Sequence, residues 1–342
     1  MKIHIKPRLF LVVAFLVGLW GQNLTAQDYR DLFKKLDPTV VTIQTVETVS
    51  GSRGIEQRRA IGTGVIVDQS GSIMTAAHVV HTADQIIVKF VDGTTTRAQV
   101  VSSVTGADVA LINVESIPQS AGVATLGDSD QTEPGEPALV IGTPFGIEHS
   151  LSIGHISGAQ TRPVLAGGTS LKVIQTDASI NHGNSGGPLF NDRGEVIGIV
   201  SHILSEGGGF DGIGFAVSIN AAKTILLERS PFWTGFEGIL LPEELSGILN
   251  VPQPSALLVQ HVTRNSIAAR AGLRGGTDKI KFRGKDVWIG GDVILEIQNT
   301  VCDCPTSFEK LHESLKSLNS GEQIQIKVLR NGEAIDLFLT MP

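Results

Sequence analysis

Several residue types are scarce in this 342-residue chain, and each scarcity excludes a class of protein. Only two cysteines occur, Cys302 and Cys304, so no disulfide can stabilise the chain before residue 302. Basic residues are outnumbered, with 27 Lys and Arg against 34 Asp and Glu, which gives a net charge of −7. Because phosphate binding needs a basic face, nucleic acid is not expected as a partner.

Long hydrophobic runs are also lacking, with one exception near the start, Leu9–Trp20. These twelve residues are short for a membrane span, which needs about 20. Basic residues precede the run and a small residue, Ala26, follows it, which is typical of a cleaved export signal over residues 1–26. Leu24 is large for a position three before the cut, so an uncleaved membrane anchor is the alternative. Either way, we expect export to the periplasm or cell envelope.

Glycine and β-branched residues are abundant, with 39 glycines and a hydrophobic fraction of 41%. Short strands joined by tight turns would explain both. After a short helix over Tyr29–Leu36, the first group of expected strands is Val40–Val49, Gly64–Asp68, Ser72–Thr75, Gln85–Val91, Ala98–Val104 and Val109–Val114. The second group is Pro137–Ile141, Leu151–Ser157, Leu171–Gln175, Val196–Val200 and Gly214–Val217. We therefore predict a mainly β protein with two six-stranded antiparallel barrels over residues 27–229.

The pattern changes after a helix predicted to start at a cap residue, Asn220. A linker over residues 230–235 and a small α+β domain over residues 236–342 are expected. Its predicted elements are helices Ser266–Ala271 and Ser307–Leu318, strands Gly290–Ile297, Gln323–Leu329 and Ala334–Leu339, and an Asn331-Gly332 turn.

The segment Gly183-Asn184-Ser185-Gly186-Gly187-Pro188 carries the clearest chemical signal. Glycines beside a serine permit backbone conformations that expose the hydroxyl and direct successive N–H groups into one space. Such donors stabilise the oxyanion that forms when a serine attacks a carbonyl. An ordinary glycine-rich turn is the alternative.

Two further segments favour the catalytic interpretation. His78 follows an apolar strand, and Asp108 begins another apolar strand of the same half of the chain. A serine nucleophile needs an imidazole as base and a buried carboxylate that fixes the imidazole tautomer. The order His, Asp, Ser places His78 and Asp108 in one barrel and Ser185 in the other, with a cleft between the barrels as the meeting place. The order does not suit an α/β-hydrolase, whose serine comes first.

At this point the chain resembles the HtrA/Deg family of serine proteases over nearly all of its length after the signal. Seven motifs in the family's order carry the resemblance: Gly62-Thr63-Gly64, Thr75-Ala76-Ala77-His78, Ala107-Asp108-Val109-Ala110, Ile141 to Gly146, Gln175-Thr176-Asp177-Ala178, Gly183 to Pro188, and Gly212 to Ala216. The resemblance implies a trypsin-like protease domain and one PDZ domain. It also implies a serine endopeptidase of unfolded or damaged proteins.

The resemblance implies a role for each matching residue. His78 is the general base, Asp108 orients it, and Ser185 is the nucleophile. Gly183, Asn184 and Ser185 form the oxyanion loop. The strand Ile199-Val200-Ser201 lines the substrate cleft, and its lack of an acidic residue favours small aliphatic side chains at the cleavage position.

Other residues near these motifs give weaker indications of function. The glycine-rich loop Ser205–Gly212 is expected to switch the site between resting and active forms. His182 stands where similar proteins usually have proline, and a neutral effect is the simplest interpretation. His81 is expected at the surface. Cys302 and Cys304 are expected as small turn residues, because two ligands do not complete a metal site.

The C-terminal region resembles a PDZ domain through Asn265 to Leu273 and Gly290 to Ile294. Such a domain binds a C-terminal peptide by strand addition and captures its carboxylate in a backbone loop. The loop would be Phe236-Glu237-Gly238-Ile239. Glu237 departs from the family pattern, which has an apolar residue there. A docking module that contacts only the protease or another subunit is the alternative.

Two functions from different classes follow. The first is proteolysis of unfolded exported proteins, and the second is a chaperone or peptide-binding scaffold with a largely silent protease site. No cofactor or metal is implied. The resemblance implies a homotrimer held by N-terminal aromatic residues, here Tyr29 and Phe33, and a short loop Glu47–Ala60 argues against a larger cage.

Overall fold

The computed structural model describes residues 29–51, 54–146, 149–163, 170–203, 211–228, 232–303 and 318–341. The predicted signal over residues 1–26, Cys304, all of the predicted helix Ser307–Leu318 except Leu318, and most of the loop Ser205–Gly212 lie outside these residues. Across the described ranges, no helix combines the length and apolar character that a membrane crossing requires. The elements from η1 onward belong to one compact unit, and most of α2 belongs to another.

Helix α2 covers Tyr29–Leu36, as the sequence predicted, and the 3-10 turn η1 covers Asp37–Thr39. Pro38 lies within this turn, which a proline with its fixed backbone angle can accept at a helix start.

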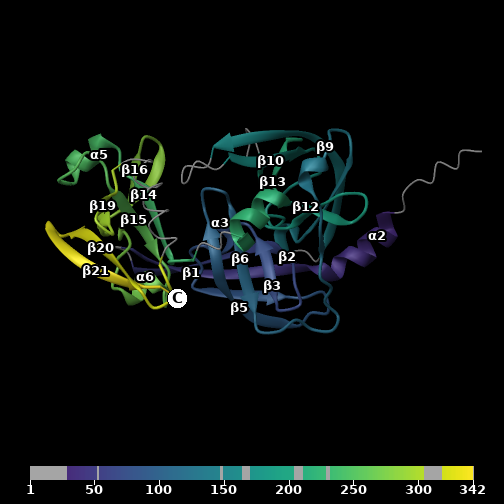
Figure 1. The fold of residues 1–342 in the computed structure, drawn as a ribbon, viewed down its shortest axis with the longest axis horizontal. Coiled ribbons are helices and arrows are strands. Elements are labelled where there is room, and N and C mark those ends of the chain that lie inside the picture. The colour runs from purple at the N-terminus through teal and green to yellow at the C-terminus, as the bar shows by residue number, and fades with distance from the viewer. Residues whose placement is uncertain are drawn as a thin grey trace, which may run out of the picture. The chain divides into compact units, whose positions relative to one another are not determined.

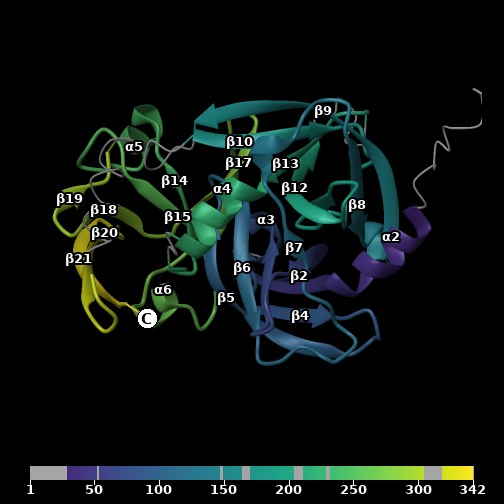
Figure 2. The same cartoon turned by 45° about the vertical axis from the view of Figure 1, so that its right-hand side comes forward.

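Six antiparallel strands then close into a first barrel in the order β1-β2-β3-β6-β5-β4 (Figures 1 and 2). The strands are β1 (Val40–Gly51), β2 (Gly54–Ile66), β3 (Ser72–Thr75), β4 (Gln85–Lys89), β5 (Thr95–Val104) and β6 (Val109–Val114). Closure removes the exposed strand edges that an open sheet would present to other chains.

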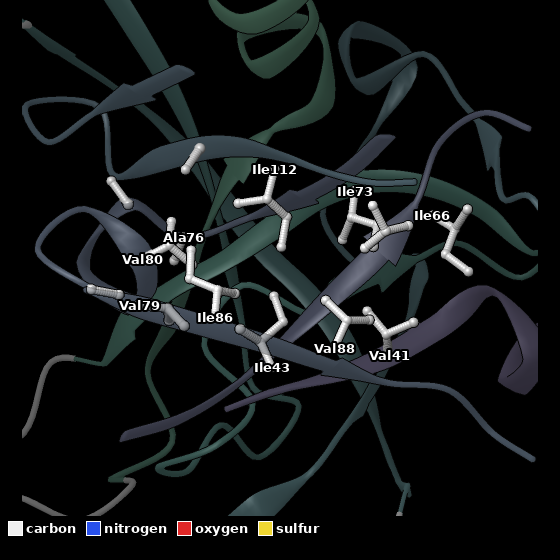
Figure 3. Packing of buried hydrophobic residues seen from close by; sticks show 14 of the residues in the cluster. Val41, Ile43, Ile66, Ile73, Ala76, Val79, Val80, Ile86, Val88 and Ile112 are labelled. Carbon is white, nitrogen blue, oxygen red and sulfur yellow. The ribbon is translucent and has the colours of Figure 1, made fainter. Parts of the chain in front are cut away.

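Mostly β-branched and small apolar side chains, together with Phe90, fill the first barrel, and none of them carries a polar group that would need a partner. Figure 3 labels ten of these side chains, which come from all strands except β5, from the short helix α3 (Ala77–Val80) and from Ala76 just before it. Ile43, Ile73 and Ile112 are fully buried. Burying a side chain of this size stabilises the fold by about 1.5–3 kcal/mol. The helix that carries His78 is therefore anchored directly in the core.

The second barrel contains six antiparallel strands, closed by the pairing of β11 with both β8 and β12. The strands are β8 (Pro137–Gly142), β9 (Ser150–Pro163), β10 (Ser170–Thr176), β11 (Pro188–Phe190), β12 (Glu195–Ile203) and β13 (Gly214–Ser218). A two-residue strand, β7 (Thr125–Leu126), adds to β12 in parallel. The prediction of two six-stranded barrels is confirmed.

The C-terminal region combines a sheet in the order β14-β15-β18-β20-β21 with short helices and a separate hairpin. Its strands are β14 (Phe236–Leu240), β15 (Leu257–Val262), β18 (Val293–Ile297), β19 (Thr300–Val301), β20 (Gln323–Arg330) and β21 (Glu333–Thr340). Its helices are α5 (Glu243–Ile248) and α6 (Ile267–Arg270), and the hairpin pairs β16 (Asp278–Phe282) with β17 (Lys285–Ile289). This is the small mixed region that the sequence predicted.

Two local predictions were wrong. The expected loop Glu47–Ala60 is mostly an extension of the β1–β2 hairpin, whose register runs from Val40 opposite Val65 to Gly51 opposite Gly54. Backbone pairing between the two strands carries the ladder beyond the apolar part of the sequence. The helix after β13 begins one residue earlier than Asn220, as α4 (Ile219–Lys223), and its cap is Ser218, whose hydroxyl accepts from Ala221 N.

Candidate active site

His78 lies on the single-turn helix α3, directly after strand β3. Its neighbours Ala77, Val79 and Val80 are buried in the core of the first barrel, so packing fixes the helix in place. The His78 side chain itself is half exposed. The local sequence, three apolar residues around one histidine, therefore holds the imidazole at the barrel surface.

Three donor groups of His78 and Ser201 contact the carboxylate of Asp108. The imidazole Nδ1 of His78 lies 2.9 Å from Oδ1 and 3.0 Å from Oδ2, and the backbone N–H of His78 donates to Oδ1 at 3.1 Å. The hydroxyl of Ser201, in β12, donates to Oδ2 at 2.5 Å. Because an ionised carboxylate only accepts hydrogen bonds, Nδ1 of His78 must carry the proton. The other ring nitrogen, Nε2, then keeps a lone pair that can act as a base.

The environment of Asp108 keeps it ionised. Burial opposes the charge, but the hydrogen bonds and the charge of His78, together with the hydrogen bond from Ser201, outweigh it and lower the pKa of Asp108. Its backbone is left-handed, with a φ of 53°, and its N–H donates to Thr105 O at 3.2 Å in the turn between β5 and β6. The carboxylate is therefore held in a fixed place between the two elements that contact it.

The segment around Ser185 is held by both barrels. Thr63 in β2 donates its N–H to Ser185 O at 2.9 Å and its hydroxyl to Gly183 O at 2.6 Å. From the second barrel, Val200 O accepts from Gly186 N at 2.7 Å. Gly186 has a φ of +81°, and a Cβ there would lie 2.1 Å from Thr75 Oγ1, so only glycine fits.

From Gly183 to Gly186, backbone N–H groups without an acceptor among the described residues alternate with N–H groups that donate a hydrogen bond. Asn184 N donates to Asn181 O at 3.0 Å, and Gly186 N is used as described. Among the hydrogen bonds of the described ranges, none uses the N–H of Gly183 or Ser185, and none joins the Ser185 hydroxyl to His78. Asn184 is buried against Gly142, where a Cβ would lie 2.6 Å from its Oδ1.

The strand expected to line the cleft divides into two kinds of residue. Ile199 and Val200 are fully buried, and Ser201 is bound to Asp108. Ser201 therefore supports the carboxylate, a role that the sequence motif alone did not reveal. His182 is exposed beside the Ser185 loop.

The expected carboxylate loop coincides with strand β14, which pairs with β15 on one side and ends the sheet on the other. The Glu237 side chain lies near His261 and Glu47, which are themselves paired at 3.5 Å between Nδ1 and Oε1. Burial of the carboxyl group raises the pKa of Glu237, and the negative charge of Glu47 raises it further, whereas His261 opposes the shift.

Two other sequence predictions are decided by the structure. His81 was expected at the surface, but its ring is partly buried and both ring nitrogens are hydrogen bonded. Cys302 is buried, which raises the pKa of its thiol to about 12. In the part of the chain that the structure describes, no cluster of His, Cys, Asp and Glu has the size of a metal site.

Known proteins are similar to this chain in sequence and in fold. The family of trypsin-like peptidase domains matches residues 62–199. A probable periplasmic serine endoprotease DegP-like protein of Halomonas elongata is 31% identical over 379 residues, covering 99% of this chain and 75% of the relative. Its counterpart in Pseudomonas putida W619 is 34% identical over 383 residues, covering 98% and 75%.

Solved structures of HtrA-type proteases are also similar to this chain. The HtrA-type protease AlgW with a decapeptide has a TM-score of 0.52 at 31% identity and covers 92% of this chain and 98% of its own. The same protease with a tripeptide has a TM-score of 0.52 at 32% identity, covering 92% and 96%.

Proposed function

Because the chain belongs to the HtrA/Deg family of serine proteases and is a serine endoprotease, we propose that it cleaves unfolded or damaged proteins through His78, Asp108 and Ser185. The observation that carries the proposal is the Nδ1 hydrogen bond from His78 to a carboxylate that is kept ionised. This bond leaves Nε2 of His78 free to take a proton. Alternative roles as a chaperone or scaffold need no such pair.

In the proposed reaction, Ser185 Oγ attacks the carbonyl carbon of the scissile peptide, and its proton passes to Nε2 of His78. The carbonyl π electrons move to oxygen and form a tetrahedral oxyanion. When the C–N bond breaks, His78 returns the proton to the leaving amine, and an acyl ester on Ser185 remains. Water then repeats the two steps, with His78 again as base, and releases the acid.

Asp108 contributes without exchanging a proton. Its charge stabilises the imidazolium of His78, and Ser201 holds the carboxylate by a hydrogen bond to Oδ2. At a pH below the lowered pKa of Asp108, the carboxylate would be protonated and this support would be lost. Since the pKa lies below its ordinary value near 3.8, the support lasts through the neutral range.

The oxyanion would be bound by the N–H groups of Gly183 and Ser185. The supporting observation is that neither N–H group has an acceptor among the hydrogen bonds of the described residues. The N–H groups of Asn184 and Gly186, in contrast, each donate to a backbone carbonyl. Unused donors next to a nucleophile are what electrostatic stabilisation of a developing charge requires. Asn184, packed against Gly142, would shape the loop.

The substrate side chain at the cleavage position would be small and aliphatic. The strand Ile199 to Ser201 carries no charged side chain: its two apolar side chains are fully buried, and its one hydroxyl is already bound to Asp108. A cationic side chain would therefore find no counter-charge on this strand.

Residues 236–342 would form a PDZ domain that captures C-terminal peptides at Phe236-Glu237-Gly238-Ile239. Support comes from strand β14, whose second edge has no partner strand among the described residues. AlgW, which is similar over most of this chain, is solved with a decapeptide and a tripeptide. We further propose that residues 27–229 form the protease domain, and residues 230–235 the linker.

Export and assembly complete the proposal. The relatives are named periplasmic endoproteases, which supports removal of residues 1–26 as a signal and action in the periplasm. A homotrimer would use the aromatic residues Tyr29 and Phe33 of α2.

The deciding experiment is degradation of fluorescein-labelled casein, an unstructured protein, by the chain without residues 1–26. A matched Ser185→Ala variant is assayed beside it, with and without added C-terminal peptides. Cleavage by the first chain only supports the proposal. Cleavage by both assigns the activity to another site, and cleavage by neither leaves a peptide-binding scaffold as the function.

A further inference from the structure

His81 makes an unusual set of contacts for a residue outside the proposed triad. It follows helix α3 directly, three residues after His78, and its backbone N–H closes the helix by donating to Ala77 O at 2.8 Å. Its ring contacts two other elements. Nδ1 lies 2.9 Å from the hydroxyl of Ser103, and Nε2 lies 3.1 Å from the backbone carbonyl of Phe236.

The partners determine the protonation of this ring. A carbonyl only accepts, so Nε2 of His81 must donate its proton to Phe236 O. In the neutral ring, Nδ1 then accepts from the hydroxyl of Ser103. Burial favours this neutral form by lowering the pKa of His81, although the bond to Phe236 opposes that shift. Both ring nitrogens are thus used, in one defined tautomer.

The bond to Ser103 connects the two elements that supply the imidazole and the carboxylate. Ser103 lies in β5, opposite Ala110 of β6, and Asp108 occupies the turn between these strands. His81 therefore links the helix of His78 to the hairpin of Asp108. This link acts on the same pair of elements as the hydrogen bond between His78 and Asp108.

The other contacts of His81 come from the C-terminal region. Besides Phe236 O, which lies at the start of β14, the indole N–H of Trp233 donates to the carbonyl of His81 at 3.1 Å. The hydroxyl of Thr263 approaches the same carbonyl at 3.4 Å. Three contacts from residues 233–263 thus converge on one residue at the end of α3.

We propose that His81 is a positioning residue for the reaction, which ties the His78–Asp108 pair to the first strand of the C-terminal region. Its two ring bonds fix α3 against two elements, and the bond to Phe236 O on β14 has the larger effect, because the hydrogen bond between His78 and Asp108 already joins α3 to the β5–β6 hairpin. This proposal rests on the proposed roles of His78 and Asp108. It assigns no contact between His81 and substrate.

The test separates the two ring bonds with amide substitutions. In His81→Gln, the side-chain amide reaches the place of Nε2 and still donates to Phe236 O. In His81→Asn, the amide reaches only the place of Nδ1 and keeps the bond to Ser103. Steady-state kcat and KM are measured on fluorescein-labelled casein with the chain lacking residues 1–26, and far-UV circular dichroism checks folding.

We expect His81→Asn to lower kcat roughly tenfold, within the hundredfold that a misplacement of about 1 Å can cost, with KM unchanged. His81→Gln, which gives up only the bond to Ser103, should lower kcat less than His81→Asn does. Equal kcat in wild type and His81→Asn overturns the proposal, as does an equal loss in both variants. If wild type itself is inactive, the proposed function fails instead.

Two further variants decide the matter if His81→Asn does not fold. Ser103→Ala removes the partner of Nδ1, and Trp233→Phe removes the indole donor while keeping an aromatic ring. Each is expected to lower kcat severalfold with KM unchanged, and an unchanged kcat in both refutes the positioning role.

Discussion

Replacing Gly186 with alanine tests how tightly the two barrels hold the Ser185 loop. The added Cβ would lie 2.1 Å from Thr75 Oγ1, 2.4 Å from Thr63 O and 2.6 Å from Ala76 N. Two of these three atoms belong to the backbone of the first barrel, so a side-chain rotation cannot relieve the contacts. The loop or the strand must move instead.

The cost has two parts. A left-handed backbone costs alanine roughly 1–2 kcal/mol relative to the right-handed one, and overpacking a close-packed site adds about 1–3 kcal/mol. Gly93 supplies a matched control, because its φ of +85° is nearly that of Gly186 at +81° and a Cβ there meets nothing within 4 Å. Gly93→Ala should show the first part alone.

Thermal unfolding followed by circular dichroism measures the difference. Gly186→Ala should be less stable than Gly93→Ala by about 1–3 kcal/mol in the free energy of unfolding. For a unit of this size, this difference lowers the unfolding temperature by roughly 2–12 °C. Casein cleavage should fall in Gly186→Ala but not in Gly93→Ala, because Gly186 directly follows the proposed nucleophile, Ser185. Equal unfolding temperatures in the two variants would refute the packing argument.

Three further predictions follow from single contacts. Ser201→Ala removes a hydrogen bond to the charged Asp108, worth about 1.5–3 kcal/mol, so kcat/KM on casein should fall roughly tenfold to a hundredfold; an unchanged value would contradict the supporting role. Glu237→Gln should raise the free energy of unfolding at pH 7 but not below pH 4.5, because the raised pKa of Glu237 means that folding opposes its charge as the pH rises; urea titrations at both pH values would show the opposite trend if the carboxylate were stabilised. Cys302, with a thiol pKa of about 12, should react with iodoacetamide at pH 8 only after unfolding in a Cys304→Ser variant; rapid labelling of the folded chain would be inconsistent with its burial.

Local signals in the sequence predicted those elements whose cause is local. The turn Asn331-Gly332 has positive φ at both residues, 51° and 85°, as a two-residue hairpin with this pair requires. Helix α6 has Ser266 as its cap, the residue at which the predicted helix begins, and Gly272 follows the last residue of the predicted helix. His78 and Asp108 were found because each stands beside an apolar strand.

One hairpin was missed although its pattern was present. In β16, Ile280 and Phe282 are partly buried and Lys279 and Lys281 are exposed, which is the alternation of a half-buried strand. The turn at Arg283-Gly284 has positive φ at both residues, 49° and 80°. The density of lysine concealed a period of two that a residue-by-residue count would have shown.

His81 was placed wrongly because its environment is not local. Its ring partners stand 22 and 155 residues away, so no window of sequence around it contains them. The same reason applies to Ser201, whose partner Asp108 is 93 residues distant. Contacts of this kind become visible only when the barrels and the C-terminal sheet are assembled.

The division of the site between two barrels has a consequence for the newly made chain. The first barrel ends at Val114, so a chain growing from its N-terminus can complete the His78–Asp108 pair early. The Ser185 loop, in contrast, depends on Val200, whose carbonyl and N–H hold Gly186 and Gly187. Any chain shorter than this point has the proposed base but no fixed position for the proposed nucleophile. The proposed nucleophile is thus held in place only once the second barrel has closed.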